Sequence, residues 1–532
     1  MAELHARLAR LSPTIERLMS IGGTPGLALG VVCLDKPVYY ANYGFRDVDR
    51  QLPVTQDTIF PVCSLAKAVT SAAMGLLVDG KKATWDSLIR NVLPAFQSTS
   101  PMLQENTTLG DILSHRTGMG WADNLILGTD GDVLLPGNDL IKFVNQLPLQ
   151  CPFRAEFGYN NLHYELAGRV IEHLSGQSYA DFVQDRLFKP LGMDRTVVST
   201  PSADLDPITI NYNALDDATP APIKFLGMGD NGYGGPSGGL RSTVEDLAKF
   251  YSAFLQGIDS QFEDGGPSSG TSILKQLPQI MSAKIAIDQP SKHESAYAFG
   301  WARVQLPGRM GQIGLNPGLL PDGMPLVGKG TSQLVIYHQG SLPGSLALAA
   351  LLPELNSAVI VLTNSLALND VADWVGQLVI EELINVTSNL KNDFVSLAEK
   401  AVAKNLEWYP FVVEDLKKGQ KSDTQPRPLE QYVGTYWDKQ HIFKIEVVHD
   451  SGTLYWLIQG LENEKFTLEH YHDNVFTWLR PRNELSKRGR WVGWDQEAIF
   501  WKVEFGVSDD ESVNSLTWAH DSGVPAVTYI KV

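Results

Sequence analysis

TIFPVCSLAKAVTSAAMGLLVDG, residues 58–80, is the stretch of the chain that best predicts its fold and chemistry. A short apolar approach precedes a helix that the sequence predicts to end at Gly80. Ser64 is expected to open this helix, with Lys67 one turn along and beside it. The core-facing stripe of the helix lies on another face and comprises Val69, Ala72, Ala73, Leu76 and Leu77.

The Ser64–Lys67 pair suits nucleophilic catalysis. A serine hydroxyl is a weak nucleophile, and a nearby amine can take its proton where burial lowers the amine's pKa toward neutrality. The helix N-terminus also directs free N–H groups at developing negative charge. Ser-x-x-Lys recurs at Ser272 and Ser388, but only the Ser64 match has the apolar approach and a buried helix. The competing interpretation is an N-cap serine with a solvated lysine.

A second candidate segment is FGYNNLHYELAGRVIEHL at 157–174, which places Tyr159 and Asn161 just before an amphipathic helix. A phenol here can relay a proton to or from Ser64 and the leaving group. The amide of Asn161 can hydrogen-bond Lys67 or a substrate carbonyl. Tyr159 alone would more often be a core or surface residue, so its assignment depends on the set of motifs.

A third segment, QLVIYHQGSLPGS at 333–345, is predicted to be a strand that carries His338, Gly340 and Ser341. His338 offers a cationic or hydrogen-bonding side chain for substrate binding. Gly340 lets a substrate backbone approach the strand closely. The N–H of Ser341 is expected to be a second oxyanion donor opposite that of Ser64.

These three segments resemble the signatures of the serine β-lactamase and penicillin-binding-protein superfamily. They follow the family's order as Ser-x-x-Lys, Tyr-x-Asn and a His-x-Gly variant of Lys-Thr-Gly. The resemblance covers residues 10–385 and is greatest to the class C-like branch, which includes esterases, D-aminopeptidases, D,D-peptidases and acyltransferases. Supporting stretches are LSHRTGM at 113–119, GGPSGGLRSTVEDLAKF at 234–250 and FGWAR at 299–303.

The resemblance implies an α+β fold, with a mixed α/β sheet domain beside a helical domain and the site between them. It also implies an acyl-serine mechanism, in which Ser64 attacks an ester or amide carbonyl while Lys67 and Tyr159 handle protons. We expect neither a metal ion nor an organic cofactor. His338 in place of lysine argues against β-lactam hydrolysis, because a mostly neutral histidine offers no fixed charge to a substrate carboxylate.

The leading functional prediction is a cytoplasmic serine hydrolase that acts on a small ester or amide. One alternative is an acyltransferase of natural-product biosynthesis that uses the same acyl-enzyme. Another is a binding or scaffold protein with a vestigial site. A G-x-S-x-G match at 235–239 is not expected to be a nucleophile elbow, because a loop and not a strand precedes it.

The chain is predicted to have a catalytic region at 1–420, a linker at 421–428 and a small antiparallel β-barrel at 429–532. Seven of the 12 Trp lie in this aromatic tail, which resembles the lipocalin-like C-terminal domain of some relatives. The barrel could shape the entrance to the site or mediate association into a homo-oligomer. We expect 121–137 to form a wall of the substrate cleft and the glycine-rich 305–330 to form another wall that acts as a lid.

Composition excludes several partners. A net charge of −17 without clustered Lys or Arg argues against nucleic acid. The absence of an apolar run of membrane-spanning length argues against a membrane partner. Only three Cys occur, which favours a reducing compartment. Cys63 directly precedes Ser64, so a thiol alkylator is expected to inactivate the enzyme by steric blockade.

Overall fold

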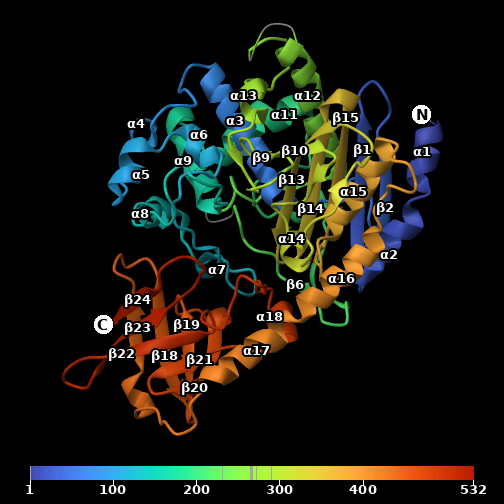
Figure 1. Cartoon of the computed structure of the whole chain (residues 1–532). Helices are drawn as coiled ribbons and strands as arrows, with labels where there is room; N and C mark the ends of the chain where they lie inside the picture. Colours follow the sequence, from blue (N-terminus) through green and yellow to red (C-terminus); the bar gives the residue numbers. More distant parts are fainter. Residues whose placement is uncertain (1, 230–231, 264–265, 267, 271, 289) are drawn as a thin grey trace.

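A nine-stranded antiparallel sheet forms the centre of the larger part of the molecule in this computed structural model (Figure 1). The structure describes residues 2–229, 232–263, 266, 268–270, 272–288 and 290–532. The strands follow the order β3 (Leu52–Pro53), β2 (Tyr39–Asp47), β1 (Gly26–Cys33), β15 (Ser357–Thr363), β14 (Ser345–Leu352), β13 (Gln333–Leu342), β10 (Ala302–Leu306), β9 (Ser295–Tyr297) and β8 (Ile285–Ala286).

Helices cover both faces of this sheet, since its central strands are almost entirely apolar and buried on both sides. One face packs against α1 (Ala2–Ala9), α2 (Ser12–Gly22), α15 (Val371–Leu383) and α16 (Phe394–Leu406). The other packs against α3 (Ala66–Asp79) and α12 (Val244–Glu263).

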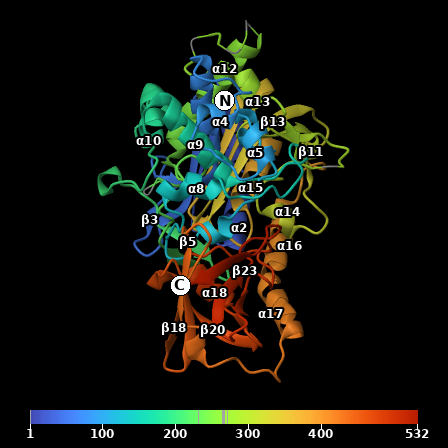
Figure 2. The ribbon, with the colours of Figure 1, turned by 90° about the vertical axis from the view of Figure 1, so that its left-hand side faces the viewer.

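A helical region lies beside α3, on the side of that helix that faces away from the sheet (Figures 1 and 2). Its longest member, α9 (Asn161–Ser175), packs against α3. Sheet, helical region and C-terminal barrel together confirm the predicted α+β class. The shorter helices here are α4 (Ile89–Val92), α5 (Pro101–Asn106), α6 (Leu109–Leu113), α7 (Asp123–Ile126), α8 (Leu140–Val144), α10 (Tyr179–Val183) and α11 (Lys189–Leu191).

The helix α3 ends before Gly80 as predicted, but it is not amphipathic. Every residue from Ala66 to Gly75 is buried, including those on the face that carries Lys67. The predicted core-facing stripe is therefore only part of the buried surface. A helix buried all round places Lys67 out of water, which a stripe on one side would not require.

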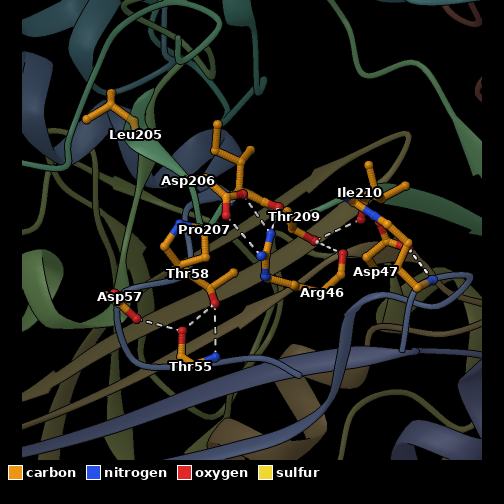
Figure 3. A network of polar contacts seen from close by, with 12 residues as sticks. Arg46, Asp47, Thr55, Asp57, Thr58, Leu205, Asp206, Pro207, Thr209 and Ile210 are labelled. Atoms are coloured by element: carbon orange, nitrogen blue, oxygen red, sulfur yellow. Dashed lines mark hydrogen bonds and ion pairs between the residues drawn. The ribbon is translucent and has the colours of Figure 1, made fainter. Parts of the chain in front are cut away.

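Arg46 of β2 holds the segment 205–210 against the edge of the sheet (Figure 3). Its guanidinium donates two hydrogen bonds to the Asp206 carboxylate, at 2.8 and 3.0 Å. The segment leads into β5 (Asn211–Ala214), which pairs with β6 (Pro220–Ile223) and β16 (Ser365–Leu366). Because Asn213 of β5 donates to the Ser486 carbonyl at 2.9 Å, this small sheet adjoins the C-terminal part.

The C-terminal part is a closed antiparallel barrel of eight strands at the lower end of the molecule (Figure 1). Its interior is filled by fully buried indoles, among them Trp456, Trp478, Trp501 and Trp518. The barrel is thus a packed core. Its strands are β17 (Gly434–Trp437), β18 (Lys444–Asp450), β19 (Thr453–Ile458), β20 (Lys465–His472), β21 (Val475–Thr477), β22 (Lys502–Val507), β23 (Val513–Trp518) and β24 (Val527–Lys531).

Two helices join the sheet region to the barrel. After α16 the chain continues into α17 (Trp408–Gly419), which runs along the barrel wall (Figures 1 and 2). Trp408 is buried and donates from its indole N–H to the Gln496 carbonyl at 3.1 Å. No helix among the described residues has both the length and the apolar character needed to cross a bilayer.

The glycine-rich segment 305–330 packs as part of the folded body. It includes β11 (Gly308–Arg309), α14 (Asn316–Leu319) and β12 (Leu326–Val327). Buried Asn316 donates to the Asp370 carbonyl at 3.1 Å and to Asp373 Oδ2 at 2.9 Å. These contacts favour a fixed wall over the expected lid. Of the glycine- and serine-rich segment 261–272, positions 264, 265, 267 and 271 lie outside the described residues.

Candidate active site

Ser64 lies in a 3₁₀ turn, Cys63–Leu65, that leads directly into α3. The preceding residue, Cys63, has a φ of 50°, a left-handed conformation that costs free energy for a residue with a side chain. The turn lies against β13 at Gly340. A Cβ on Gly340 would lie 2.8 Å from the Cys63 Cβ and 3.1 Å from the Ser64 N atom. Only glycine lets the strand and the Ser64 turn approach this closely.

Lys67 contacts the Ser64 hydroxyl from a fully buried position. Its Nζ lies 3.1 Å from Ser64 Oγ, 2.8 Å from Asn161 Oδ1 and 2.7 Å from the Ser237 carbonyl oxygen. Burial lowers the pKa of Lys67 to about 7, against the opposing effect of the Asp123 and Glu165 charges. The amine is therefore able to exchange a proton near neutral pH.

Tyr159, from the Tyr-x-Asn motif, also contacts the Ser64 hydroxyl. Its phenol donates to Ser64 Oγ at 2.9 Å. Burial raises the pKa of Tyr159 well above its usual value, so the phenol keeps its proton and acts as a hydrogen-bond donor. The ring packs against His115, with ring centroids 4.5 Å apart, which fixes its position.

Asn161 begins α9 and uses both ends of its amide within the protein. Its Oδ1 accepts from Lys67, and its Nδ2 donates to Asp123 Oδ2 at 2.9 Å. The Asp123 contact thus fixes which end of the amide faces the lysine. Of the two roles that the sequence allowed, the geometry favours contact with Lys67 over contact with a substrate carbonyl.

His338 does not line the cavity at Ser64, and it is 1 % exposed. Its Nε2 lies 2.9 Å from the Tyr297 hydroxyl, and its Nδ1 lies 2.5 Å from the Gln339 carbonyl. Burial and the Lys67 charge lower its pKa to about 3, so the ring is neutral at pH 7. Both ring nitrogens contact protein groups in this structure, and the expected substrate-binding role of His338 stays a prediction. His338 supports the neighbouring rings of Tyr159 and Tyr297.

Ser341 lies on a stretch of β13 that has a free edge. Leu342 and Ser345 flank a two-residue turn, so the alternation of an antiparallel pair makes Ser341 and Leu346 a non-hydrogen-bonded pair. In agreement, the Leu346 N–H donates to Thr363 Oγ1 at 3.1 Å, away from β13. Pairing with β10 ends at Tyr337. The Ser341 backbone therefore points its polar groups away from β14, and Ser341 lines the same cavity as Ser64.

A cavity of about 490 Å³ opens over Ser64, between the sheet, the helical region and the barrel. Residues from both expected wall segments, 121–137 and 305–330, contribute to it. The barrel contributes as well, so it shapes the site. The lining residues are Ser64, Trp121, Asp123, Asn124, Leu127, Tyr159, Asn161, Ile313, Gly314, Leu315, Gln339, Ser341, Leu342, Trp491, Asp495, Asp521 and Ser522.

The barrel is attached to this cavity through buried polar contacts with α7 and the loop after it. Asn124 donates to Asp495 Oδ2 at 3.0 Å and accepts from Gln496 Nε2 at 2.8 Å. Thr129 donates from its hydroxyl to Glu464 Oε1 at 2.7 Å. The side chain of Glu464 is fully buried and lies 3.5 Å from the buried Arg490 guanidinium.

Several site residues were not predicted from the sequence. Ser237 lay within a supporting stretch and a rejected G-x-S-x-G match and was given no role, yet its carbonyl is a partner of Lys67. Asp123 fell inside a predicted wall without a role of its own. Asp495 and Asp521 come from the barrel, more than 300 residues from Ser64 in the numbering, and no local motif marks them.

The fold and the site together define a class of protein. A serine at the start of a buried helix contacts an amine whose pKa burial lowers and a phenol that stays protonated. This is the geometry of a serine hydrolase that works without a histidine base.

Comparison with known families gives the same class. The family model described as Beta-lactamase matches residues 11–380, and the chain belongs to this family of serine hydrolases and penicillin-binding proteins. A second model, described as Domain of unknown function (DUF3471), matches residues 418–528.

Individual relatives are distant. Unguisins hydrolase ungD' of Aspergillus campestris is 26 % identical over 442 residues, 78 % of this chain and 72 % of that protein. Penicillin-binding protein 4 of Amycolatopsis lactamdurans is 28 % identical over 281 residues, 52 % of this chain and 71 % of that protein. The solved octameric penicillin-binding protein homologue of Pyrococcus abyssi shares the fold, with a TM-score of 0.57, 20 % identity and coverage of 98 % of this chain and 99 % of that chain.

Proposed function

We propose that this chain hydrolyses a small ester or amide through an acyl intermediate on Ser64. One observation carries the proposal, namely the set of contacts around Lys67 Nζ. Two acceptors, Asn161 Oδ1 and the Ser237 carbonyl, lie within 2.8 Å of it. In a neutral amine these two acceptors take both N–H groups, which leaves the lone pair for the proton of Ser64.

In the acylation step, Lys67 takes the proton from Ser64 Oγ as that oxygen bonds to the substrate carbonyl carbon. The carbonyl oxygen gains the negative charge, and the N–H groups of Ser64 and Ser341 stabilise it. The intermediate then collapses, and the bond to the leaving group breaks. Tyr159, which keeps its own proton at neutral pH, passes a proton to the leaving group and regains one from Lys67.

Deacylation reverses these proton movements. Water takes the place of the leaving group, loses a proton toward Tyr159 and Lys67, and bonds to the acyl carbon. Ser64 leaves with a proton, so the free enzyme and a carboxylic acid are regenerated.

The test is the hydrolysis of 4-nitrophenyl acetate by the full chain and by Ser64→Ala. We expect the variant to lose at least about 100-fold in kcat/KM, and a rapid quench of the wild type to show one acetyl group on the Ser64 peptide. Thr70→Ala, which alters a buried hydroxyl further along α3, is the matched control. Full activity of Ser64→Ala would refute the proposal.

Hydrolysis is favoured over acyl transfer because a relative that covers 78 % of the chain carries the name of a hydrolase. Transfer to an alcohol or amine would use the same acyl-enzyme. An acyltransferase of natural-product biosynthesis therefore stays the alternative proposal. Product partition with and without added acceptors separates the two. The intact contacts at Ser64 count against a vestigial binding protein.

A reducing, cytoplasmic setting stays part of the proposal, and it is supported by three cysteines that are all free thiols. The lipocalin-like resemblance of the tail is supported by the closed barrel of eight strands. A ligand inside that barrel is not proposed, because indole rings fill its interior.

A further inference from the structure

Two buried histidines lie beside Tyr159 and take no part in the proposed proton transfers. His115 belongs to the segment 113–119 and is 0 % exposed, and His163 lies in the first turn of α9 and is 1 % exposed. Their Nδ1 atoms are 3.3 Å apart. Burial lowers the pKa of both rings, to about 3 for His163. Both rings are therefore neutral at pH 7, and each carries a single proton on one of its two nitrogens.

The contacts of His115 place its proton on Nε2. The backbone N–H of Asn160 donates to His115 Nδ1 at 3.1 Å. A ring nitrogen that accepts a hydrogen bond carries no proton, so the proton of this neutral ring is on the other nitrogen. Nε2 has no hydrogen-bond partner among the described residues. The rings of Tyr159, Tyr164 and Tyr297 pack around the imidazole, with centroids 4.5, 5.2 and 5.0 Å from its own.

The contacts of His163 place its proton on Nδ1. Its Nε2 lies 2.7 Å from Thr117 Oγ1, which accepts from the Met119 N–H at 3.0 Å. With the proton on Nδ1, His163 donates to the bare Nδ1 of His115, and the Thr117 hydroxyl donates to Nε2. With the proton on Nε2, two lone pairs would face one another, and the buried hydroxyl would lose this acceptor. The hydrogen bonds therefore run in one direction, from Thr117 through His163 to His115.

His115 holds Tyr159 through the residues on either side of it. The carbonyl of His115 accepts from the Gly158 N–H at 2.8 Å, and its Nδ1 accepts from the Asn160 N–H. Its ring lies against the Tyr159 ring, and the Tyr159 phenol donates to Ser64 Oγ at 2.9 Å. A change in the orientation of the His115 ring would therefore move the phenol relative to Ser64.

We propose that Thr117, His163 and His115 are positioning residues that hold the Tyr159 phenol where it can give its proton to the leaving group. This inference rests on the proposed function of Ser64. The Thr117 hydroxyl keeps the His163 proton on Nδ1, and that proton helps to fix the His115 ring against Tyr159. Departure of the leaving group then depends on Thr117 more than attack by Ser64 does, because the phenol passes its proton in the second step.

The experiment compares two esters that share an acetyl group and differ in their need for a proton. 4-Nitrophenyl acetate loses a stable phenolate, whereas 4-nitrobenzyl acetate loses an alkoxide that must be protonated as it leaves. Thr117→Val removes the hydroxyl, and we expect it to lower kcat/KM of the benzyl ester relative to that of the phenyl ester at least about tenfold. Thr117→Ser keeps the hydroxyl and should retain the wild-type ratio. An equal loss on both esters, as a purely structural role produces, overturns the inference.

A double variant tests whether the effect passes through Tyr159. Tyr159→Phe removes the phenol and should by itself lower the same ratio of kcat/KM values. Thr117→Val should then lower that ratio no further, because substitutions that act through one group are not additive. A second fall of similar size in the double variant would show that Thr117 acts by another route, and it would contradict the inference.

The proton positions are tested in the wild-type protein without turnover. In protein that carries isotopically labelled histidine, the protonated and bare nitrogens of a neutral imidazole differ strongly in chemical shift. We expect protonated Nδ1 at His163 and protonated Nε2 at His115, with the signals assigned by His163→Gln and His115→Gln. A proton on Nε2 of His163 overturns the inference, whether or not the Thr117 variant folds.

A second spectrum separates this inference from the proposed function. Tyrosine labelled at the carbon that bears the hydroxyl gives a signal for Tyr159, which Tyr159→Phe assigns. That signal should shift in Thr117→Val and keep its position in Thr117→Ser even if no ester acylates Ser64, in which case only the proposed function fails. Acylation of Ser64 together with an unchanged Tyr159 signal in Thr117→Val overturns the inference alone.

Discussion

Lys67 determines how the rate should depend on pH. The amine can accept the Ser64 proton only when neutral, and it is neutral above its pKa of about 7. We therefore expect kcat/KM for a neutral ester to rise as pH increases toward 7 and to reach a plateau above it. A stopped-flow pH profile measures this. A rate that falls with rising pH over this range would contradict the role of Lys67.

Asp123 gives that profile a sharper test. Its negative charge raises the pKa of Lys67, while burial lowers it. Asp123→Asn removes the charge but keeps an oxygen that can accept from Asn161. The midpoint of the kcat/KM profile is therefore expected to move to lower pH. An unchanged midpoint would show that Asp123 does not influence the base.

Gly340 is expected to tolerate no side chain. An added Cβ would lie 2.8 Å from the Cys63 Cβ and 2.9 Å from the Val62 carbonyl oxygen, so Gly340→Ala forces β13 away from the Ser64 turn. We expect a loss of about 1–3 kcal/mol in the free energy of unfolding and at least about tenfold in kcat. Urea unfolding and steady-state kinetics measure both. Gly318→Ala, where no atom lies within 4 Å of the added Cβ, is the control.

Cys63 should resist alkylation, contrary to the expectation from its place beside Ser64. Its thiol is fully buried, and burial raises its pKa to about 12. Iodoacetamide on the folded protein should label only Cys33 and Cys151, which are partly exposed, and activity should persist. Peptide mass mapping of folded and urea-unfolded samples checks this. Inactivation that follows labelling of Cys63 would restore the steric-blockade interpretation.

At the scale of elements, α3 and β13 show what the sequence could predict. The helix α3 was recognised from the helical spacing of its apolar residues, and the strand β13 from a run of residues typical of strands. The motif spacing also identified Ser64, Lys67 and Tyr159, whose side chains meet in the structure. The local pattern predicted the elements and these contacts well.

The same local pattern could not predict what surrounds those residues. The burial that makes His338 neutral comes from side chains of other elements, including Tyr297 of β9. The burial that lowers the pKa of Lys67 likewise comes from packing around the whole of α3. Residue type and spacing carry no information about such long-range packing, so the sequence could not show that His338 is buried and neutral.

At the scale of the whole molecule, the barrel completes the cavity. The sequence had left two roles open for the barrel, namely shaping the entrance to the site and mediating self-association. Only docking brings Asp495 and Asp521 beside Asn124, and docking depends on surfaces far apart in the chain. Self-association, the other role, stays a prediction that analytical ultracentrifugation decides.

Glu464 is expected to hold the barrel and the cavity wall together. Its carboxylate accepts from Thr129 and lies beside Arg490 in a fully buried setting. Glu464→Gln should therefore lower the free energy of unfolding by about 3–5 kcal/mol and raise KM, because the loop after α7, which carries Thr129, loses its anchor. Calorimetry and kinetics measure these effects. Glu462→Gln, an exposed change in the same turn, should do neither; equal behaviour of the two variants would contradict this role.

The central claim is that Ser64 carries the acyl group, and peptide mass spectrometry tests it most directly. The protein is quenched in acid within milliseconds of mixing with 4-nitrophenyl acetate and then digested. We predict one added acetyl group, located on the peptide that contains Ser64 and absent from Ser64→Ala. An acetyl group on a different residue, or turnover by Ser64→Ala at the wild-type rate, would contradict the account.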